Sequence, residues 1–463
     1  MKQRKHVYIQ TWGCQMNELD TDRIVEILSV DGYERVWDPE RADLILLNTC
    51  SVREKAEHKV YSSLGRFRRI KEERPGVIVG VSGCVAQMVG RKMLERIPYL
   101  DLVCGPGSYA RLPEMVAAIE AKRHRRLCEL DLGYENLMRT YDRSFAPRIV
   151  APGKVSAYVT IMTGCDKFCT FCIVPHVRGR EWSRPSAQIL EEVRELAGQG
   201  VREVVLLGQT VNSYGKRPKG DLSFPALLDR IAGIEGIERI RFTSPFPKDL
   251  SDELIEVYRH NPKVCRHIHL PVQSGSDTIL KRMKRQYTRR DFLERVDRLR
   301  SVAPDLAITT DFIVGFPGER EEDFEDTMSL LETVRFDASF SFSFSPRPGT
   351  PAATAPDPVP EEIANERLLR LQQRQGEITL EIERGYLGRA VEILVEGGSR
   401  RGQGQLTGRT SCNKIVNFPG DETLIGRFVS VRIEEVLPNS MRGSVVSERP
   451  ETGALLVGDA VAT

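Results

Sequence analysis

The chain has 463 residues, 40% of them hydrophobic and 29% charged, and its 67 Lys and Arg nearly balance 65 Asp and Glu. At about 150 residues per domain, this length predicts roughly three domains, each large enough to bury a core. The net charge of +2 excludes a uniformly basic nucleic-acid-binding surface but allows a local basic patch. No apolar run approaches about 18 residues and no secretory signal follows the basic N-terminus, so we expect a cytoplasmic protein without a membrane partner.

Two proline-containing segments divide the chain into domains. Residues 141–153 carry two prolines and show no clear period, and residues 345–360 carry six prolines. Proline fixes φ and removes a backbone donor, so the second segment is neither a helix nor a central strand. A helix is predicted over 361–384, ending at Gly385. The domains are therefore expected at 4–122, 151–381 and 384–447.

The apolar runs predict an α/β fold for the first two domains. In the first domain, short runs alternate with helical stretches, which is typical of a doubly wound parallel sheet; they lie at 6–10, 44–47, 77–81 and 102–103. The second domain repeats this alternation and predicts a full or partial parallel barrel of (βα)6 type, with strands at 155–162, 203–207, 239–243, 267–270, 306–314 and 338–344. The third domain has short strands rich in Val, Gly and Arg, which predict a small β-barrel.

Three of the ten cysteines share one position in the first predicted sheet. Ten are too few for a disulfide scaffold in a chain of this length and point to metal binding or catalysis. Cys14, Cys50 and Cys84 each follow a predicted strand, and the C-terminal ends of parallel strands meet at one edge, where ligands bind. Packed thiols are the alternative, but the shared position favours a metal site. Zinc would take four ligands, whereas an iron–sulfur cluster with three thiolates would keep one iron open.

The other cysteines outside the second domain's motif are less regular. Cys104 ends the fourth apolar run and could supply a fourth ligand, although we expect a packed thiol there. Cys128, Cys265 and Cys412 have no partner pattern, so we expect them to pack in the core or at the surface.

Cys165, Cys169 and Cys172 form a CxxxCxxC motif after the first predicted strand of the second domain. The motif lacks the fourth cysteine of the ferredoxin patterns, and three thiolates in a compact loop can hold one small cluster. It is similar to the signature of the radical S-adenosylmethionine (SAM) enzymes, and a zinc knuckle is the alternative. The resemblance implies an open iron that binds SAM and an electron transfer that yields a 5′-deoxyadenosyl radical.

Loops after the other barrel strands could contact SAM, because active sites of parallel barrels are built from strand-to-helix loops. They span 208–214, 271–276 and 315–319, and ordinary turns would look the same. The SAM-binding candidates, taken from the cysteine motif and these loops, are Phe171, Gln209, Gln273 and Ser274. His267 and His269 share one face of a strand, where a structural pair and a ligand role both stay open.

Further motifs resemble the methylthiotransferases, most closely the MiaB-type branch that modifies transfer RNA. The resemblance covers nearly the whole chain, and its motifs span 13–17, 48–56, 269–276, 283–288 and 408–418. The branch that modifies a ribosomal protein usually has a Pro-Lys pair after the first cysteine, where this chain has Gln15 and Met16. Trp12 replaces a commoner tyrosine, a change that we expect to be harmless.

The resemblance implies a specific reaction and set of cofactors. The substrate would be the N6-isopentenylated adenosine next to the anticodon of tRNA, and the product would carry a methylthio group at C2. Cys165, Cys169 and Cys172 would hold a radical-generating [4Fe–4S] cluster, and Cys14, Cys50 and Cys84 an auxiliary [4Fe–4S] cluster whose open iron carries the donated sulfur. Two SAM molecules would be used per turnover, together with an electron donor and a sulfur source. We expect a monomer.

Three alternative functions stay open. A related enzyme could act on a threonylcarbamoylated adenosine of tRNA or on an aspartate of a ribosomal protein. An RNA-binding protein could use the cysteines for a structural metal. An electron-transfer protein is the third, but it explains neither the open ligand sets nor the basic β-barrel.

The C-terminal domain is rich in basic residues, as phosphate contacts to a tRNA require. Small β-barrels often bind RNA through strands and loops, and a solvated basic face is the alternative. The RNA-binding candidates are Arg400, Arg401, Arg409 and Lys414. The basic runs at 122–126 and 281–285 could extend this footprint, although such runs are usually solvated surface.

Overall fold

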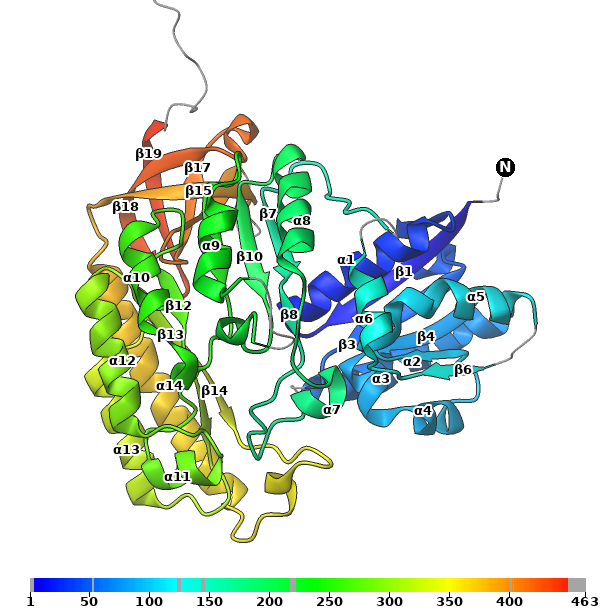
Figure 1. Ribbon diagram of the computed structural model, residues 1–463, viewed down its shortest axis with the longest axis horizontal. Helices are drawn as coiled ribbons and strands as arrows, with labels where there is room; N and C mark the ends of the chain where they lie inside the picture. Colours follow the sequence, from blue (N-terminus) through cyan, green and yellow to red (C-terminus); the bar gives the residue numbers. More distant parts are fainter. Residues whose placement is uncertain are drawn as a thin grey trace, which may run out of the picture.

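A computed structural model describes residues 4–51, 54–122, 126–142, 146–216, 222–399, 402 and 404–448. The chain forms an N-terminal α/β domain, a central partial barrel and a small closed β-barrel, in this order (Figure 1). The small β-barrel lies at one end of the central barrel, and the N-terminal domain lies at its side (Figure 1). No helix in the described part of the chain is both long and apolar enough to span a bilayer.

The N-terminal domain contains the predicted parallel sheet, with six strands in the order β2-β1-β3-β4-β5-β6. Its strands are β1 (Lys5–Trp12), β2 (Tyr33–Val36), β3 (Leu44–Thr49), β4 (Ile78–Gly83), β5 (Leu102–Cys104) and β6 (Leu127–Glu129). Strands β3 and β4 are buried at every residue, which explains their continuous apolar sequence. The edge strands β2 and β6 are short and partly exposed, and the apolar pattern did not predict them. Because β6 belongs to this sheet, the domain extends beyond the expected end at residue 122.

Helices cover both faces of this sheet. Its helices are α1 (Gln15–Ser29), α2 (Glu54–Glu73), α3 (Cys84–Val89), α4 (Arg91–Arg96), α5 (Leu112–Glu120) and α6 (Tyr134–Tyr141). One apolar core joins α1 and α5 to the sheet, and a second joins α2, α3 and α4 to its other face. The sheet is therefore doubly wound, and its strand C-termini form one edge.

The central domain is a partial parallel barrel made of two three-stranded sheets, ordered β11-β10-β7 and β12-β13-β14. Its strands are β7 (Ser156–Thr160), β10 (Glu203–Leu207), β11 (Arg239–Phe242), β12 (His267–His269), β13 (Ala307–Val314) and β14 (Ala338–Ser343). A bridge between Ile240 and Val264 links the two sheets. The predicted strand 155–162 is shorter than expected, because β8 (Met162–Thr163) pairs instead with β9 (Trp182–Ser183).

Helices cover the convex side of this barrel and form the largest apolar core. They are α8 (Ser186–Gly198), α9 (Phe224–Ala232), α10 (Asp252–His260), α12 (Arg289–Val302), α13 (Glu321–Val334) and α14 (Glu361–Arg384). Two shorter helices, α7 (Val174–Arg178) and α11 (Asp277–Arg282), follow the cysteine motif and β12. The position of α14 confirms the helix predicted after the proline-rich segment.

The C-terminal domain is a closed five-stranded barrel with the order β15-β16-β17-β19-β18. Its strands are β15 (Ala390–Gly398), β16 (Gln405–Thr410), β17 (Ile415–Pro419), β18 (Phe428–Leu437) and β19 (Ser440–Glu448). Alternating side chains such as Ile393, Val416 and Phe418 fill its interior.

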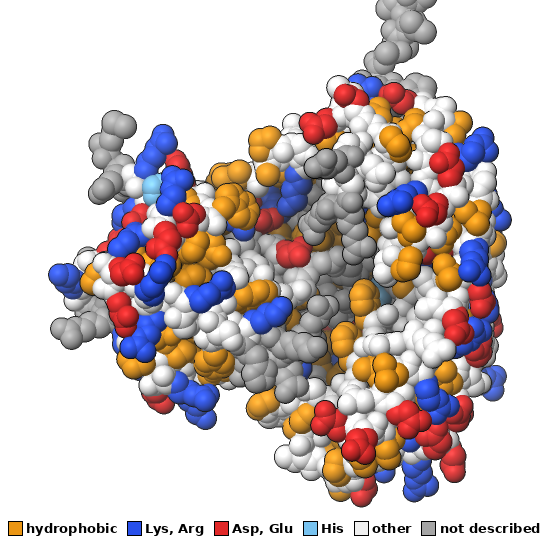
Figure 2. Space-filling view, turned by 180° about the vertical axis from the view of Figure 1, so that it is seen from behind, with side chains coloured by type: hydrophobic (Ala, Val, Ile, Leu, Met, Phe, Trp, Pro, Cys, Tyr) orange, Lys and Arg blue, Asp and Glu red, His pale blue; other side chains and the backbone are white. Residues whose placement is uncertain are grey.

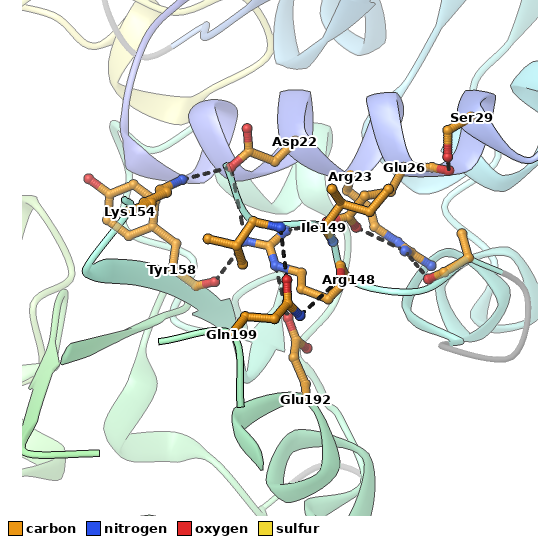
Figure 3. Close-up of polar contacts among 12 residues, drawn as sticks. Asp22, Arg23, Glu26, Ser29, Arg148, Ile149, Lys154, Tyr158, Glu192 and Gln199 are labelled. Carbon is orange, nitrogen blue, oxygen red and sulfur yellow. Dashed lines mark hydrogen bonds and ion pairs between the residues drawn. The ribbon is translucent and has the colours of Figure 1, made fainter. Parts of the chain in front are cut away.

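A buried ion network joins the N-terminal domain to the central barrel (Figure 3). Arg148, in the connection between the domains, donates to Glu26 of α1 at 3.0 Å and lies 3.8 Å from Glu192 of α8. It also donates to the backbone oxygen of Tyr158 in β7 at 3.3 Å. Glu26 accepts a second bond, of 3.0 Å, from Arg23. This connection, predicted to be a boundary between domains, therefore carries charges that fix α1 against the barrel.

Candidate functional site

The first cysteine trio lies at the C-terminal edge of three neighbouring strands. Cys14 follows β1 and is the N-cap of α1, Cys50 follows β3, and Cys84 begins α3 directly after β4. A Cβ atom placed on Gly13 would lie 2.5 Å from the Cβ of Cys50, which shows how closely the first two loops approach. Gly83 has φ +90°, and a Cβ there would meet the backbone oxygen of Thr49 at 2.6 Å. Glycine is thus required where these loops converge.

The thiols of this trio have different environments. A hydrogen bond with Cys50 lowers the pKa of Cys14 to about 6, and the positive charge of Arg178 acts in the same direction. Burial raises the pKa of Cys84, although Arg178 donates to its sulfur at 3.3 Å. A lowered pKa favours the thiolate, which is the form of cysteine that binds metal.

The second trio lies in the loop between β8 and α7. Cys165 and Cys169 are each only 7% exposed. Burial raises the pKa of Cys165 to about 11 and that of Cys172 to about 12. Arg285 donates to the sulfur of Cys169 at 3.4 Å. Buried thiols whose proton is hard to lose need a nearby cation to become ligands, and Arg285 supplies one charge.

Two short helices bring the trios together. Helix α7 follows Cys172, helix α3 begins at Cys84, and Ile173 and Val177 pack against Cys84 in one apolar cluster. Arg178 at the end of α7 also forms an ion pair with Asp20 of α1. Within the described residues, no group of three or more His, Cys, Asp or Glu side chains is arranged to hold a single metal ion.

Part of the barrel interior is closed by other domains. Met16 and Leu19 of α1 pack against Val205 and Leu207, which lie on the face of β10 opposite its covering helices. The turn between β16 and β17 enters near the base of the barrel, where Arg241 donates to the backbone oxygens of Thr410 at 3.3 Å and Ser411 at 3.2 Å. The motif at 408–418 therefore docks the small β-barrel.

The inner face of β13 and β14, in the other half of the central barrel, is partly exposed. We call it the open wall; it is formed by Thr309, Asp311, Ile313, Phe340 and Phe342. Phe340 and Phe342 pair in register with Asp311 and Ile313 and are 56% and 42% exposed. The alternate residues Phe312 and Val314 pack in the core beneath the helices, so the open wall faces the interior. Seen from behind, the molecule is hollowed between the N-terminal domain and the barrel (Figure 2). Ile313 shares an apolar cluster with Phe171 of the cysteine motif, so this wall reaches the second trio.

The two histidines are held as a pair at the edge of the open wall. The Thr309 hydroxyl lies 3.1 Å from Nε2 of His267 and 3.0 Å from Nδ1 of His269. His269 lies 3.3 Å from Asp311, and its ring contacts Phe340 edge to face. Burial lowers the pKa of His267 well below its usual value. The predicted common face is confirmed, and the contacts observed here are those of a structural pair.

The SAM-binding candidates differ in their contacts. Gln209 accepts a bond of 2.6 Å from the backbone of Gly164, next to Cys165, and thereby supports the cysteine loop. Gln273 has φ +78° and pairs with β13 through its backbone. Ser274 is fully buried, and its hydroxyl lies 3.3 Å from that of Thr327. Contacts of Phe171, Gln209, Gln273 and Ser274 with SAM stay predictions.

The residues predicted to bind RNA differ in burial. Arg409 is partly exposed and lies 3.2 Å from Glu396. Lys414 is buried, with its ammonium 3.1 Å from Asp337 and 3.6 Å from Glu383, so it fastens the small β-barrel to the central one. The ammonium group of Lys414 is buried between two carboxylates, so it is not available to an RNA phosphate and the prediction of an RNA contact at this residue loses its basis. Arg400 and Arg401 lie outside the described residues.

The remaining cysteines are packed as expected. Cys104 is fully buried in the core beside α1 and α5, and burial raises its pKa. Cys265 is buried near Glu203, and Cys128 and Cys412 are partly buried.

Sequence reasoning missed Arg178 and Arg285. Both are buried arginines that donate to a cysteine sulfur, but in the sequence they stand in charge-rich stretches that are typical of solvated surface. The basic run at 281–285 ends at Arg285, so its last charge points inward rather than to solvent.

Family models match the three domains separately. Residues 6–105 match the uncharacterized protein family UPF0004, residues 159–331 match the radical SAM superfamily, and residues 384–446 match the TRAM domain. Among solved structures, a radical SAM methyltransferase, TsrM from Kitasatospora setae, is similar with a TM-score of 0.56 and 14% identity, over 76% of this chain and 77% of that one. At this identity the likeness shows the fold alone.

Curated relatives match almost the whole chain. A tRNA-2-methylthio-N(6)-dimethylallyladenosine synthase from Syntrophotalea carbinolica is 50% identical over 96% of this chain and all of its own. One from Geobacter metallireducens is 50% identical over 96% of this chain and 99% of its own, and one from Aeromonas salmonicida is 48% identical over 96% and 93%. With its radical SAM and TRAM domains in the same order, the chain belongs to the family of the tRNA-2-methylthio-N(6)-dimethylallyladenosine synthases, which are radical SAM enzymes that use iron–sulfur clusters.

Proposed function

We propose that this enzyme attaches a methylthio group to C2 of the N6-isopentenylated adenosine next to the anticodon of tRNA. One observation carries the proposal: the chain is 50% identical in sequence, over nearly its full length, to relatives that are named for this product. Two contacts support the proposal: Cys84 packs against Ile173 and Val177, which follow the second trio, and Phe171 of the cysteine motif shares an apolar cluster with Ile313 of the open wall.

Each trio fits a [4Fe–4S] cluster by the chemistry of its donor set. Each trio supplies three thiols, the number that leaves one iron of such a cluster open, and one buried arginine that donates to a sulfur. We propose that Cys165, Cys169 and Cys172 hold the radical-generating cluster and that Cys14, Cys50 and Cys84 hold the auxiliary one. When bound, these groups supply the electron for SAM cleavage and the sulfur that is inserted.

The chain's own residues orient the reaction. The open wall would carry the substrate base, because exposed aromatic rings stack on bases and favour apolar substituents. Cys14 is the N-cap of helix α1, and Met16 and Leu19 of this helix pack on β10, which supports a position of Cys14 close to the barrel interior.

The open wall also favours an isopentenyl over a threonylcarbamoyl substituent. None of its five residues is Lys or Arg, and the carboxylate of Asp311 lies beside His269. A threonylcarbamoyl group carries a carboxylate, which would need a cation on burial, whereas an isopentenyl group needs only apolar contacts.

Nucleoside analysis tests this function directly. In a strain that lacks this chain, tRNA should accumulate isopentenyladenosine and lose its methylthio derivative, and the intact chain should restore it. Unchanged methylthio-isopentenyladenosine in that strain, together with loss of methylthio-threonylcarbamoyladenosine, would identify the rival substrate instead.

The aromatic rings of the open wall should decide affinity for the substrate base. Phe340→Ala and Phe342→Ala should each raise the KM for an isopentenylated anticodon stem-loop about tenfold, because stacking is worth about 1–3 kcal/mol per base. Steady-state kinetics with the modified stem-loop measures this effect. Leu369→Ala, which removes a 67% exposed side chain on α14, is the matched control and should leave KM unchanged. Equal KM values in all three variants would contradict a stacking role.

We further propose that the small β-barrel contacts the tRNA backbone through Arg400, Arg401 and Arg409, while Lys414 holds the barrel in place. A one-electron donor and a sulfur source must act with the enzyme, which we propose to be a cytoplasmic monomer. The single charge of Arg409 is shared with Glu396, so the tRNA phosphates would have to compete with that carboxylate.

A further inference from the structure

Each cysteine trio has one buried arginine that donates an N–H bond to a ligand sulfur. Nε of Arg178 lies 3.3 Å from the sulfur of Cys84, and Nη1 of Arg285 lies 3.4 Å from the sulfur of Cys169. Arg178 is 4% exposed and Arg285 is 6% exposed. Neither arginine belongs to a cysteine motif, yet the guanidinium group of each reaches a cysteine sulfur of one trio.

The two arginines differ in how their charge is compensated. Arg178 forms a two-point ion pair with Asp20, at 2.5 Å and 3.3 Å, and Tyr109 donates to the same carboxylate at 3.2 Å. Asp20 is 3% exposed, so this pair is buried and nearly neutral as a unit.

Arg285 has only neutral partners apart from the cysteine. It donates to the hydroxyl of Tyr287 at 2.8 Å and to the backbone oxygen of Pro271 at 2.7 Å, and the ring of Phe246 lies 4.5 Å away. In the part of the chain that the structure describes, it forms no ion pair with a carboxylate. A buried arginine charge needs an anionic partner, and the thiolates of the second trio would provide it once they hold the proposed cluster.

We propose that Arg178 and Arg285 are positioning residues that give the two clusters different electron affinities, with the uncompensated charge of Arg285 favouring reduction at the second trio. The inference rests on the proposed assignment of the trios as cluster ligands. Hydrogen bonds to sulfur and net charge both set the potential of an iron–sulfur site. Both trios receive the hydrogen bond, but only the second receives a full positive charge.

The redox step is a single electron transfer. A low-potential one-electron donor loses one electron, and the site held by Cys165, Cys169 and Cys172 gains it; no bond or proton changes in this step. Arg285 lowers the free energy of the more negative state. At the first trio, the carboxylate of Asp20 offsets this effect of Arg178, so that site keeps its oxidised state more readily.

Redox titration of full-length chains with one trio removed tests the inference. Cys14→Ala/Cys50→Ala/Cys84→Ala isolates the second site, and Cys165→Ala/Cys169→Ala/Cys172→Ala isolates the first. Anaerobic titration with dithionite, followed by electron paramagnetic resonance, gives the one-electron reduction equilibrium of each. Arg285→Gln should make reduction of the second site at least tenfold less favourable, a shift of about 59 mV. Arg285→Lys keeps the charge and should stay within about threefold of the parent.

The first site supplies the matched comparison. The double variant Asp20→Asn/Arg178→Gln removes a neutral pair and should change the reduction equilibrium constant of the first site by less than about threefold. Arg178→Gln alone leaves a buried carboxylate without its cation and should lower that equilibrium constant about tenfold. A shift in Arg285→Gln no larger than in the double variant would overturn the inference, as would equal shifts in Arg285→Gln and Arg285→Lys.

Iron and sulfide counts per chain show whether a variant has lost its cluster or only changed its reduction equilibrium. If Arg285→Gln fails to load its cluster while Arg285→Lys loads, the charge is required and the inference stands. If both fail equally, the arginine acts only as a packing residue and the inference falls. A parent chain with intact arginines but without iron and sulfide would instead contradict the cluster assignment in the proposed function.

Discussion

Replacing Cys169 by alanine should abolish both 5′-deoxyadenosine formation and methylthiolation. Cys169 is 7% exposed, receives the bond from Arg285 and lies between Cys165 and Cys172 in one tight loop. If the second trio holds the cluster as proposed, two thiolates cannot replace three, so the electron needed for SAM cleavage cannot be delivered. Anaerobic incubation with dithionite and SAM, with chromatography of the nucleoside products, measures both activities, which we expect to fall below detection.

The matched control for this prediction is Cys128→Ala. Cys128 is a partly buried free thiol outside both trios, so its removal tests whether loss of any cysteine harms the enzyme. We expect this variant to retain both activities. Substantial 5′-deoxyadenosine formation by Cys169→Ala would contradict the assignment of the second trio.

Cys50→Ala separates the two trios. It removes the hydrogen bond that lowers the pKa of Cys14 and one of the three proposed ligands of the auxiliary cluster, but it leaves Cys165, Cys169 and Cys172 intact. Cleavage of SAM should therefore continue at a reduced level while methylthiolation stops. Full methylthiolation by this variant would show that the first trio does not carry the inserted sulfur.

The central strands, and the edge of the sheet that carries Cys14, Cys50 and Cys84, could be predicted because they depend on short apolar runs in the sequence. Strands β3 and β4 are buried throughout and read as continuous apolar runs, so Cys50 and Cys84 could be placed at their ends. The edge strands β2 and β6 are partly exposed, and nothing in their short sequences distinguishes them from loops. Prediction therefore worked where burial on both faces forces an apolar sequence.

The charged residues around the site could not be predicted, because their role comes from tertiary contacts. Lys414 stands among surface arginines in the sequence but lies between Asp337 and Glu383 in the structure. Arg285 ends a basic run and turns inward, and Arg148 lies in a segment for which the sequence predicts only a domain boundary. A single sequence does not say which charge of such a run finds a buried partner.

Arg148→Met should lower the free energy of unfolding by about 3–5 kcal/mol, because it leaves buried carboxylates with one cationic partner fewer. The Arg148 side chain is 2% exposed and connects Glu26 of α1 to Glu192 of α8 (Figure 3). Denaturant unfolding followed by circular dichroism measures the loss, and limited proteolysis should cut the connection between the domains sooner.

The same variant should also uncouple the two half-reactions. Because Glu26 lies on the helix whose N-cap is Cys14, a looser α1 would no longer hold Cys14 in place beside the rest of the first trio. We expect more 5′-deoxyadenosine per methylthiolated product, although both trios keep all their cysteines. Arg290→Met removes an exposed arginine paired with Glu294 on α12 and should change neither the unfolding midpoint nor this ratio. An unchanged ratio in Arg148→Met would mean that the ion network stabilises the junction without setting the position of the first trio.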